Sequence, residues 1–168
     1  MKKLVPLAAL IALPAVAHAS TAWPVQASGS ACSMVNAVVT EASNPLTLTH
    51  DSATGEVVLT IETSDITSGL ANSGSLDLSI VFLDNGDIKH DDGWDPRSFG
   101  YTRQGEVTRF TTRFAGERPV RQILADLSSS KHIGLLYRGQ VISSTNLAGA
   151  ASSIGELRAC SRRAIAAN

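Results

Sequence analysis

The sequence lacks the short motifs that identify several large classes of enzyme. It contains no glycine-rich phosphate-binding or dinucleotide-binding motif, which argues against a nucleotide enzyme. It also has no G-x-S-x-G motif, which argues against an α/β-hydrolase. Aromatic residues are scarce, at 5% of the 168 residues. A folded core must therefore be built mainly from Leu, Ile, Val and Ala, and the chain is long enough to bury one.

The N-terminus has the parts of a secretory signal peptide in their usual order. Two lysines are followed by an apolar run, Leu4–Val16, and by small residues before Ser20, which is the pattern that signal peptidase cleaves. The alternative is an uncleaved membrane anchor, but the run is shorter than the roughly 20 residues needed to span a bilayer. We therefore predict a signal peptide at 1–19 and a mature chain at 20–168, periplasmic or secreted and without stable membrane insertion after cleavage.

Cysteine is nearly absent, because Cys32 and Cys160 are the only two in the sequence. In an exported chain this predicts one disulfide, which would fasten the end of the mature chain to its beginning. The alternative is a pair of free, buried thiols. If the disulfide forms, everything between the two cysteines must fold as a single β-rich domain.

Positive charge is nearly absent from the first half of the mature chain. From Ser20 to Asp95 there are eleven acidic residues against one basic residue, whereas from Pro96 to Asn168 there are four acidic residues against eleven basic ones. The first interpretation is that the two halves fold against each other and largely compensate. The alternative is a bipolar surface with a basic face for an anionic partner.

Alternation of apolar and polar residues predicts β-strands along most of the mature chain. The predicted strands are Cys32–Val39, Pro45–His50, Glu56–Thr63, Leu76–Phe82, Val107–Phe114, Ile133–Tyr137 and Gln140–Ser144. The second and third form a predicted hairpin, and Asn85-Gly86 favours another tight turn because it tolerates positive φ angles. Residues 21–30 are expected to be an irregular or edge lead-in. No regular alternation is found from His90 to Gly105.

Two segments have the spacing of amphipathic helices. Val120–Leu127 carries apolar residues at i, i+3, i+4 and i+7 after Pro119, a residue that the first helical turn tolerates. The closing segment 146–160 is the second, with Asn146 as its predicted N-cap and Cys160 beside its apolar stripe rather than at the centre. The predicted fold is therefore mainly β (α+β), an antiparallel β-sandwich or half-barrel with two short helices, the last at the C-terminus.

Acidic residues are concentrated in one segment, the acidic loop, which contains Asp84, Asp87, Asp91, Asp92 and Asp95. Their spacing does not match a calcium EF-hand, and a single histidine among them is too little for zinc. The first interpretation is that they form turns and a solvated surface, so we predict no metal and no cofactor. Weak calcium binding and the docking of a basic enzyme are the alternatives.

Three arginines form what we call the arginine row. Arg109 and Arg113 share one face of the strand Val107–Phe114, and Arg103 lies shortly before it. Such a row is typical of the solvated side of a strand. The alternative is a binding surface for an anionic glycan, a lipid head group or an acidic protein. Aromatic residues do not alternate with these arginines, which argues against a nucleic-acid partner.

His50 and Asp51 are the nearest approach to a catalytic relay, but neighbours on a strand point to opposite faces and cannot form one. His50 shares its face with apolar residues, which indicates an edge or core position. Catalysis is therefore not predicted. A cleft that joined His50 or His90 to a serine and a carboxylate would reverse this expectation.

Trp23 and Cys32, the Val120–Leu127 helix, the Ile133–Tyr137 strand and the closing segment 146–160 follow one another in an order that resembles the invasion-associated locus B family. These are small exported proteins of Gram-negative bacteria. Family members usually carry a further cysteine pair in the middle, which this sequence lacks. The resemblance implies a β-rich, non-catalytic envelope or secreted protein associated with host-cell contact, with no catalytic residue to carry over.

These observations favour a non-catalytic exported protein that binds a protein or an anionic glycan in the bacterial envelope or at a host interface. The alternative is a periplasmic inhibitor or immunity-type protein that presents the acidic loop, Asp84–Asp95, to a basic enzyme such as a wall hydrolase. The candidate binding residues are those of the arginine row and the acidic loop.

Overall fold

The computed structural model describes residues 23–36, 44–64, 69–84, 87–88 and 94–166. The predicted signal peptide and its cleavage site lie outside these residues. The elements of the described chain are β1 (Val25–Ser28), β2 (Ala31–Val35), β3 (Leu46–Asp51), β4 (Glu56–Thr63), β5 (Ser73–Asp84), β6 (Asp87–Ile88), β7 (Arg97–Gln104), β8 (Val107–Phe114), α1 (Glu117–Ser129), β9 (His132–Tyr137), β10 (Gln140–Asn146) and α2 (Ala150–Ala166).

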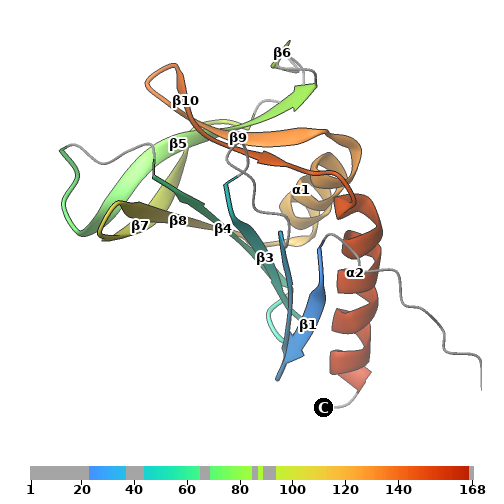
Figure 1. Ribbon diagram of the computed structural model, residues 1–168. Coiled ribbons are helices and arrows are strands. Elements are labelled where there is room, and N and C mark those ends of the chain that lie inside the picture. Colours follow the sequence, from blue (N-terminus) through green and yellow to red (C-terminus); the bar gives the residue numbers. More distant parts are fainter. Residues whose placement is uncertain (1–22, 37–43, 65–68, 85–86, 89–93, 167–168) are drawn as a thin grey trace, which may run out of the picture.

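The strands form one antiparallel sheet in the order β1-β2-β3-β4-β8-β7-β5-β9-β10, with β6 paired to β5. The sheet bends along β5, whose first half, Ser73–Leu78, pairs with β7 and whose second half, Ser79–Leu83, pairs with β9. In Figure 1, β9 and β10 therefore lie above β3 and β4, and the two helices lie at the open side. The predicted fold class is confirmed, with the sheet in its open half-barrel form.

Cross-strand register places the inward-facing side chains of β2, β3, β4 and β8 in rows. One row contains Cys32, His50, Val57 and Phe114. Cys32, Val57 and Phe114 are fully buried, whereas His50 is only partly buried. His50 therefore lies on the apolar face, as its position in the strand predicts, but at a point where the core opens.

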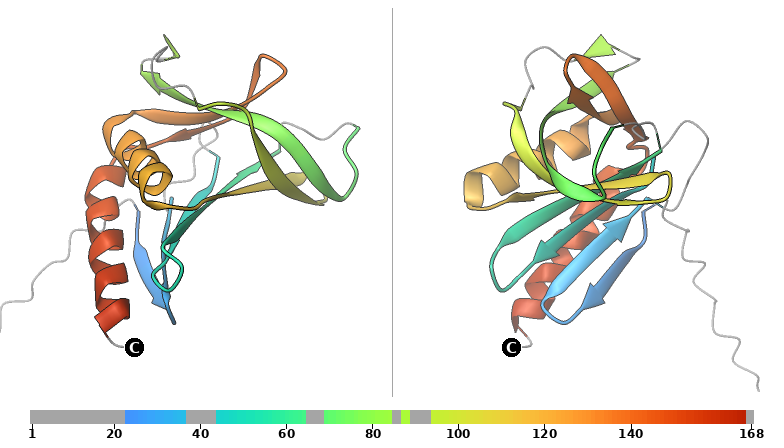
Figure 2. Two further views of the ribbon diagram at one scale, coloured as in Figure 1. Left: turned by 180° about the vertical axis from the view of Figure 1, so that it is seen from behind. Right: turned by 90° about the vertical axis from the view of Figure 1, so that its left-hand side faces the viewer.

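The two helices cover the inner face of the sheet. α1 buries Ile123, Leu124 and Leu127, which confirms the predicted helix. α2 buries Ile154 and Leu157 and lies against β1, β2, β3 and α1, so that it is seen behind the strands in the right-hand view of Figure 2. In the described part of the chain, no helix combines the length and the apolar character that crossing a membrane requires.

The disulfide between Cys32 and Cys160 fastens α2 to β2 and confirms the predicted pairing. Cys160 is 7% exposed, so the apolar face of α2 extends further toward β2 than predicted, with Cys160 at its edge. The buried face of α2 contains Ala150, Ser153, Ile154, Leu157, Cys160 and Ser161. The predicted stripe included Ala151, which is exposed. Alanine and serine differ little in apolar surface, so the pattern alone could not decide which of them faces inward.

α2 begins later than predicted, and Asn146 is not its N-cap. Asn146 is the last residue of β10, and its Oδ1 accepts a hydrogen bond from the amide of Ala148 at 2.8 Å. An asparagine side chain that bonds two residues ahead forms a local turn instead of capping a helix. Gly149 then adopts a φ of 81°, a left-handed conformation that glycine allows and a helix does not contain.

Two strands were not predicted as such. β7 occupies part of the segment in which no alternation was found. It buries Phe99 and Tyr101, but Gly100 between them and the polar residues around them hid the pattern.

β1 is one of the two edge strands of the sheet, which agrees with the edge alternative for the lead-in. Before it, Trp23 is buried, and its Nε1 donates to the carbonyl of Ala148 at 3.0 Å.

The half-barrel is joined across its opening by hydrogen bonds from β10 to β4 and to Asn44, two residues before β3. The amide of Asn44 donates to the carbonyl of Ser144 at 3.0 Å, and the hydroxyl of Thr145 donates to the carbonyl of Asn44 at 2.8 Å. The hydroxyl of Thr63 donates to the carbonyl of Ile142 at 3.1 Å. These contacts hold the upper and lower parts of the bent sheet at a fixed separation.

Candidate functional site

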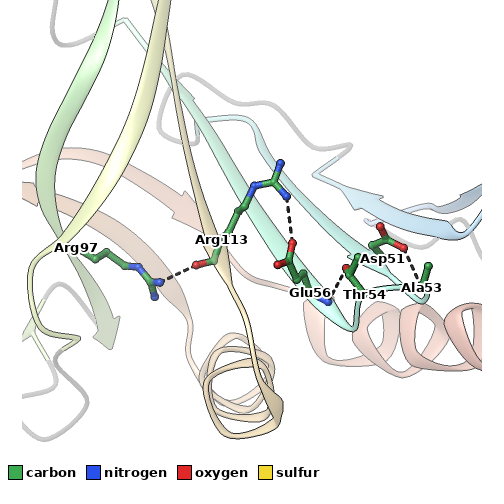
Figure 3. Close-up of polar contacts among 6 residues, drawn as sticks. All are labelled: Asp51, Ala53, Thr54, Glu56, Arg97 and Arg113. Carbon is green, nitrogen blue, oxygen red and sulfur yellow. Dashed lines mark hydrogen bonds and ion pairs between the residues drawn. The ribbon is translucent and has the colours of Figure 1, made fainter.

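A cleft of about 540 Å³, which we call the helix cleft, lies between the β3–β4 turn and the two helices. Its lining residues are His50, Thr54, Gly55, Gly116, Glu117, Val120, Arg121, Leu124 and Arg158. Figure 3 shows the turn that carries Thr54 beside the ribbon of α2, with α1 seen end-on. Clefts of roughly 300–1,000 Å³ are typical of small-molecule sites.

The floor of the helix cleft is apolar. Val120 and Leu124 lie one turn apart on α1, so they share a face, and Leu124 is 3% exposed. Gly55 and Gly116 contribute backbone only, at positive φ angles of 69° and 86° that a larger residue would adopt with strain. Because Gly55 and Gly116 carry no side chain, neither position covers the apolar side chains of Val120 and Leu124.

His50 is a partly buried titratable group of the cleft lining, whereas Glu117, Arg121 and Arg158 are exposed. Its Nδ1 is buried and has no hydrogen-bond partner among the described residues. Burial lowers the pKa of His50 below its ordinary value of 6.5; the nearby Asp51 carboxylate opposes the shift, and the positive charge of Arg158 adds to it. The imidazole is therefore neutral near pH 7 and can both donate and accept a hydrogen bond.

Asp51 belongs to the turn rather than to the cleft. Its Oδ1 accepts a hydrogen bond from the amide of Ala53 at 2.9 Å (Figure 3), and its backbone carbonyl accepts one from the amide of Gly55 at 2.8 Å. The hydrogen bond from Ala53, followed by one from Ser30, lowers the pKa of Asp51. The carboxylate thus holds the turn in shape and is not aligned with His50.

The charged residues at the rim of the cleft come from the helices. Glu117 and Arg121 form an exposed i, i+4 ion pair at 3.2 Å. Arg158 on α2 forms no ion pair with any residue that the structure describes. The rim therefore carries one positive charge that no described carboxylate compensates.

The helix cleft meets one condition of the enzyme alternative and not the others. His50 does lie in a cleft, but none of the described lining residues is a serine or a cysteine. His90 lies outside the described residues. The hydroxyl of Thr54 accepts a hydrogen bond from the amide of Glu56 at 3.3 Å, and Asp51 is engaged in the turn. An apolar floor with a few polar groups at its edge is an arrangement suited to binding.

The structure divides the arginine row between the two faces of the sheet. Arg109 and Arg113 lie on the outer face, where acidic residues of β4 pair with them, whereas Arg103 is the register partner of the buried Thr108 and so belongs to the other face. Arg109 donates through Nε and Nη2 to Oε1 of Glu62, at 2.8 and 2.6 Å. Arg113 donates to Oε2 of Glu56 at 3.1 Å and points away from the helices in Figure 3. Arg103 donates to a backbone carbonyl of the adjoining turn. The two ion pairs join the acidic first half of the chain to the basic second half, as the compensation interpretation predicts.

Only part of the acidic loop can be placed. Asp84 ends β5 and is the register partner of Asp87 in β6, as the predicted turn requires. Asp95 is exposed, whereas Asp91 and Asp92 lie outside the described residues. Within the described ranges, no three His, Cys, Asp or Glu side chains gather in a way that could hold a metal ion. The inhibitor hypothesis depends on Asp91 and Asp92 and stays a prediction.

Arg97 was not singled out from the sequence, yet it joins β7 to β8 beside α1. Its guanidinium lies over the ring of Phe114 at 4.1 Å and donates to the carbonyl of Arg113 at 2.7 Å. Trp94 packs edge-on against Phe114 at 5.2 Å and donates from Nε1 to Oδ2 of Asp126 on α1 at 3.0 Å. Burial lowers the pKa of Arg97. This cluster fixes α1 on the sheet and so positions one wall of the helix cleft.

No family model matches the chain, and the searches of curated proteins and of solved structures found no match either.

Proposed function

We propose that the chain is a non-catalytic, exported binding protein that holds a small, largely apolar ligand in the helix cleft. The observation that carries the proposal is the composition of the cleft, in which Val120 and Leu124 form an apolar floor and the partly buried His50 is among the few polar groups of the lining. Kinship with the invasion-associated locus B family is part of the same proposal, because the resemblance implies a non-catalytic exported protein.

Export is supported by two features of the chain. The segment 1–19 has the order of a signal peptide. The disulfide between Cys32 and Cys160 is a bond that persists in oxidising compartments such as the periplasm. N-terminal sequencing of the mature protein should give Ser20 as the first residue, and an intact N-terminus would contradict cleavage at this site.

The size of the cleft sets the affinity to expect. A ligand that buries about 200 Å² of apolar surface gains roughly 5 kcal/mol from that burial. Association costs reduce this gain, and polar contacts at the rim offset part of the reduction. We therefore expect dissociation constants on the order of 0.1–1 mM for simple apolar ligands, with tighter binding when the rim is also used.

Blocking the cleft from either wall tests the proposal. The neutral apolar probe N-phenyl-1-naphthylamine should fluoresce more strongly when it enters the cleft of the full mature protein. Val120→Trp fills the cleft from α1 and Thr54→Trp fills it from the turn, so each should abolish most of the signal. Val107→Trp is the matched control, because Val107 is 43% exposed and does not line the cleft.

Circular dichroism and the melting temperature establish that each tryptophan variant is folded. Because the two blocking residues lie on separate elements, a folding defect in one leaves the other as a test. The proposal is wrong if the wild-type protein does not bind the probe. It is also wrong if folded Val120→Trp and Thr54→Trp bind the probe as well as Val107→Trp does.

A further inference from the structure

The rim of the helix cleft has an unequal charge distribution. Of its three charged lining residues, Glu117 and Arg121 neutralise each other in an i, i+4 pair. Arg158 has no ion-pair partner among the described residues. The three charged lining residues therefore sum to one positive charge. The Asp51 carboxylate also acts on His50, but it does not line the cleft and accepts a hydrogen bond within the turn. A ligand with a single negative charge would balance the positive charge of the lining.

Arg158 and His50 both line the helix cleft, where one group of a ligand can meet them together. The positive charge of Arg158 also helps to lower the pKa of the imidazole. Since the Nδ1 of His50 is buried and without a described partner, the ring nitrogen left to meet a ligand is Nε2. A guanidinium presents a planar fork of donors that matches a carboxylate, and a neutral imidazole can donate one further hydrogen bond.

The apolar floor continues from this polar end along α1. Val120 is partly buried and Leu124 is almost fully buried, and they lie one helical turn apart. One turn of α-helix spans about 5.4 Å, so the floor suits an extended apolar chain or a ring rather than a polar sugar. The cleft thus has a charged end and an apolar end.

We propose that the helix cleft binds an amphipathic monocarboxylate, such as a medium-chain fatty acid, with its carboxylate at Arg158 and His50 and its apolar chain along Val120 and Leu124. This inference rests on the proposed function and adds the class of ligand. A phosphate monoester carries about −1.5 to −2 charges at pH 7, more than the one uncompensated guanidinium matches. A monoanion fits the charge of the rim.

Four ligands that share the same apolar chain and differ in head group distinguish the contribution of the head group to binding from that of the chain. Decanoate, 1-decanol, decyl phosphate and decyltrimethylammonium are each titrated against bound N-phenyl-1-naphthylamine on the full mature protein, below their critical micelle concentrations. We expect decanoate to displace the probe at the lowest concentration, about ten-fold below 1-decanol. A factor of ten corresponds to about 1.4 kcal/mol, within the range for a hydrogen bond to a charged group.

Arg158→Gln should weaken the binding of decanoate by about five- to ten-fold and change the binding of 1-decanol by less than about two-fold. Arg163→Gln is the matched control, since it removes the same charge from an exposed position of α2 outside the cleft lining. It should leave both ligands unchanged. Both substitutions are at exposed positions, and the melting temperature checks that each variant is folded.

The outcomes separate this inference from the proposed function. If 1-decanol, decyl phosphate or decyltrimethylammonium binds as tightly as decanoate, the monocarboxylate assignment is overturned while binding in the cleft stands. If Arg158→Gln and Arg163→Gln weaken decanoate equally, the assignment of its carboxylate to Arg158 is overturned. If the probe itself does not bind, no displacement can occur, and the proposed function fails together with this inference.

Discussion

The outer face of the sheet and the helix cleft both carry arginines. On the outer face Arg109 and Arg113 each have an acidic partner, whereas at the cleft Arg121 has one and Arg158 has none among the described residues. On the outer face, Glu62 and Arg109 are direct register partners in β4 and β8, and Glu56 pairs with Arg113. At the cleft, Arg158 faces a turn and an apolar floor. The sequence had indicated the arginine row as a candidate for anion binding. In the structure, glutamates of β4 already neutralise Arg109 and Arg113.

The difference follows from how the two surfaces are built. Antiparallel register brings strand residues face to face at about 4.5–5.5 Å, so opposite charges in a sheet pair almost automatically. A helix packed on a turn has no such register, and the charge of Arg158 meets no described carboxylate. An anion should therefore prefer the helix cleft to the outer face, and three further predictions test this contrast.

The largest expected effect comes from removing the bond that holds α2 beside the cleft. Cys160→Ala deletes a disulfide that spans 128 residues. Losing such a bond costs about 2–5 kcal/mol, so the melting temperature under oxidising conditions should fall clearly. Hydrogen exchange should speed up first in α2, with β4 and β8 less affected. The decanoate site should weaken with the helix.

The controls for this prediction are the variant that removes the other cysteine, Cys32→Ala, and the double variant that removes both. Cys32→Ala and the double variant should each cost the same as Cys160→Ala, because all three remove one bond. A melt of Cys160→Ala that matches the wild type under oxidising conditions would show that the disulfide does not hold α2.

A smaller effect is expected from pH at the cleft. His50 has a lowered pKa when folded, because burial and Arg158 outweigh the opposing Asp51; Glu117 and Arg121 are the other charged groups of the lining. The unfolded chain therefore binds the proton more readily. The stability from neutral His50 is complete above its ordinary pKa near 6.5 and declines as the pH falls below it.

His50→Gln should remove this part of the pH dependence. Because the ring is partly solvated, the difference should be about 1 kcal/mol or less. Urea midpoints of the wild type and His50→Gln, measured at several pH values between 7.5 and 5, give the comparison. Asp51, whose pKa is also lowered, loses stability in the same direction as the pH falls, but only below its ordinary value of 3.8, which lies outside this range. Parallel curves for the two proteins would contradict the prediction.

The smallest effect is expected on the outer face. The side chains of Arg109 and Glu62 are 55% and 30% exposed, so their ion pair should contribute about 0.5 kcal/mol. A double-mutant cycle with Arg109→Ala and Glu62→Ala measures the coupling, which added salt should reduce. Neither substitution should change decanoate binding. A loss of binding in Arg109→Ala like that in Arg158→Gln would place the anion on the outer face after all.

Much of the fold could be predicted because its signals are local. The hairpin of β3 and β4, the long strand β5 and the helix α1 all follow from apolar residues at spacings of two or of three and four. β7 was missed because two aromatic residues around Gly100 make a weak alternation. The register of α2 was shifted because small residues such as Ala151 and Ser153 do not distinguish its faces.

The candidate site was predicted less well. His50 was correctly placed on an apolar face, and Val120 and Leu124 on an apolar stripe, but each was interpreted as part of an ordinary core or edge. Arg158 was not singled out at all. His50 and Arg158 are 108 positions apart along the chain, and no local pattern indicates that a turn and two helices meet around these residues.

By itself, the sequence determined the kinds of element, the faces of most strands, and the pairing of Cys32 with Cys160. It could do so because side-chain direction repeats with the backbone geometry of each element, and because two cysteines allow a single intramolecular bond. The tertiary structure decided which charges meet. Glu56 and Glu62 neutralise Arg113 and Arg109, while Arg158 in the cleft that His50 also lines has no described ion-pair partner. Strand register and helix packing, which depend on the whole chain, set those distances.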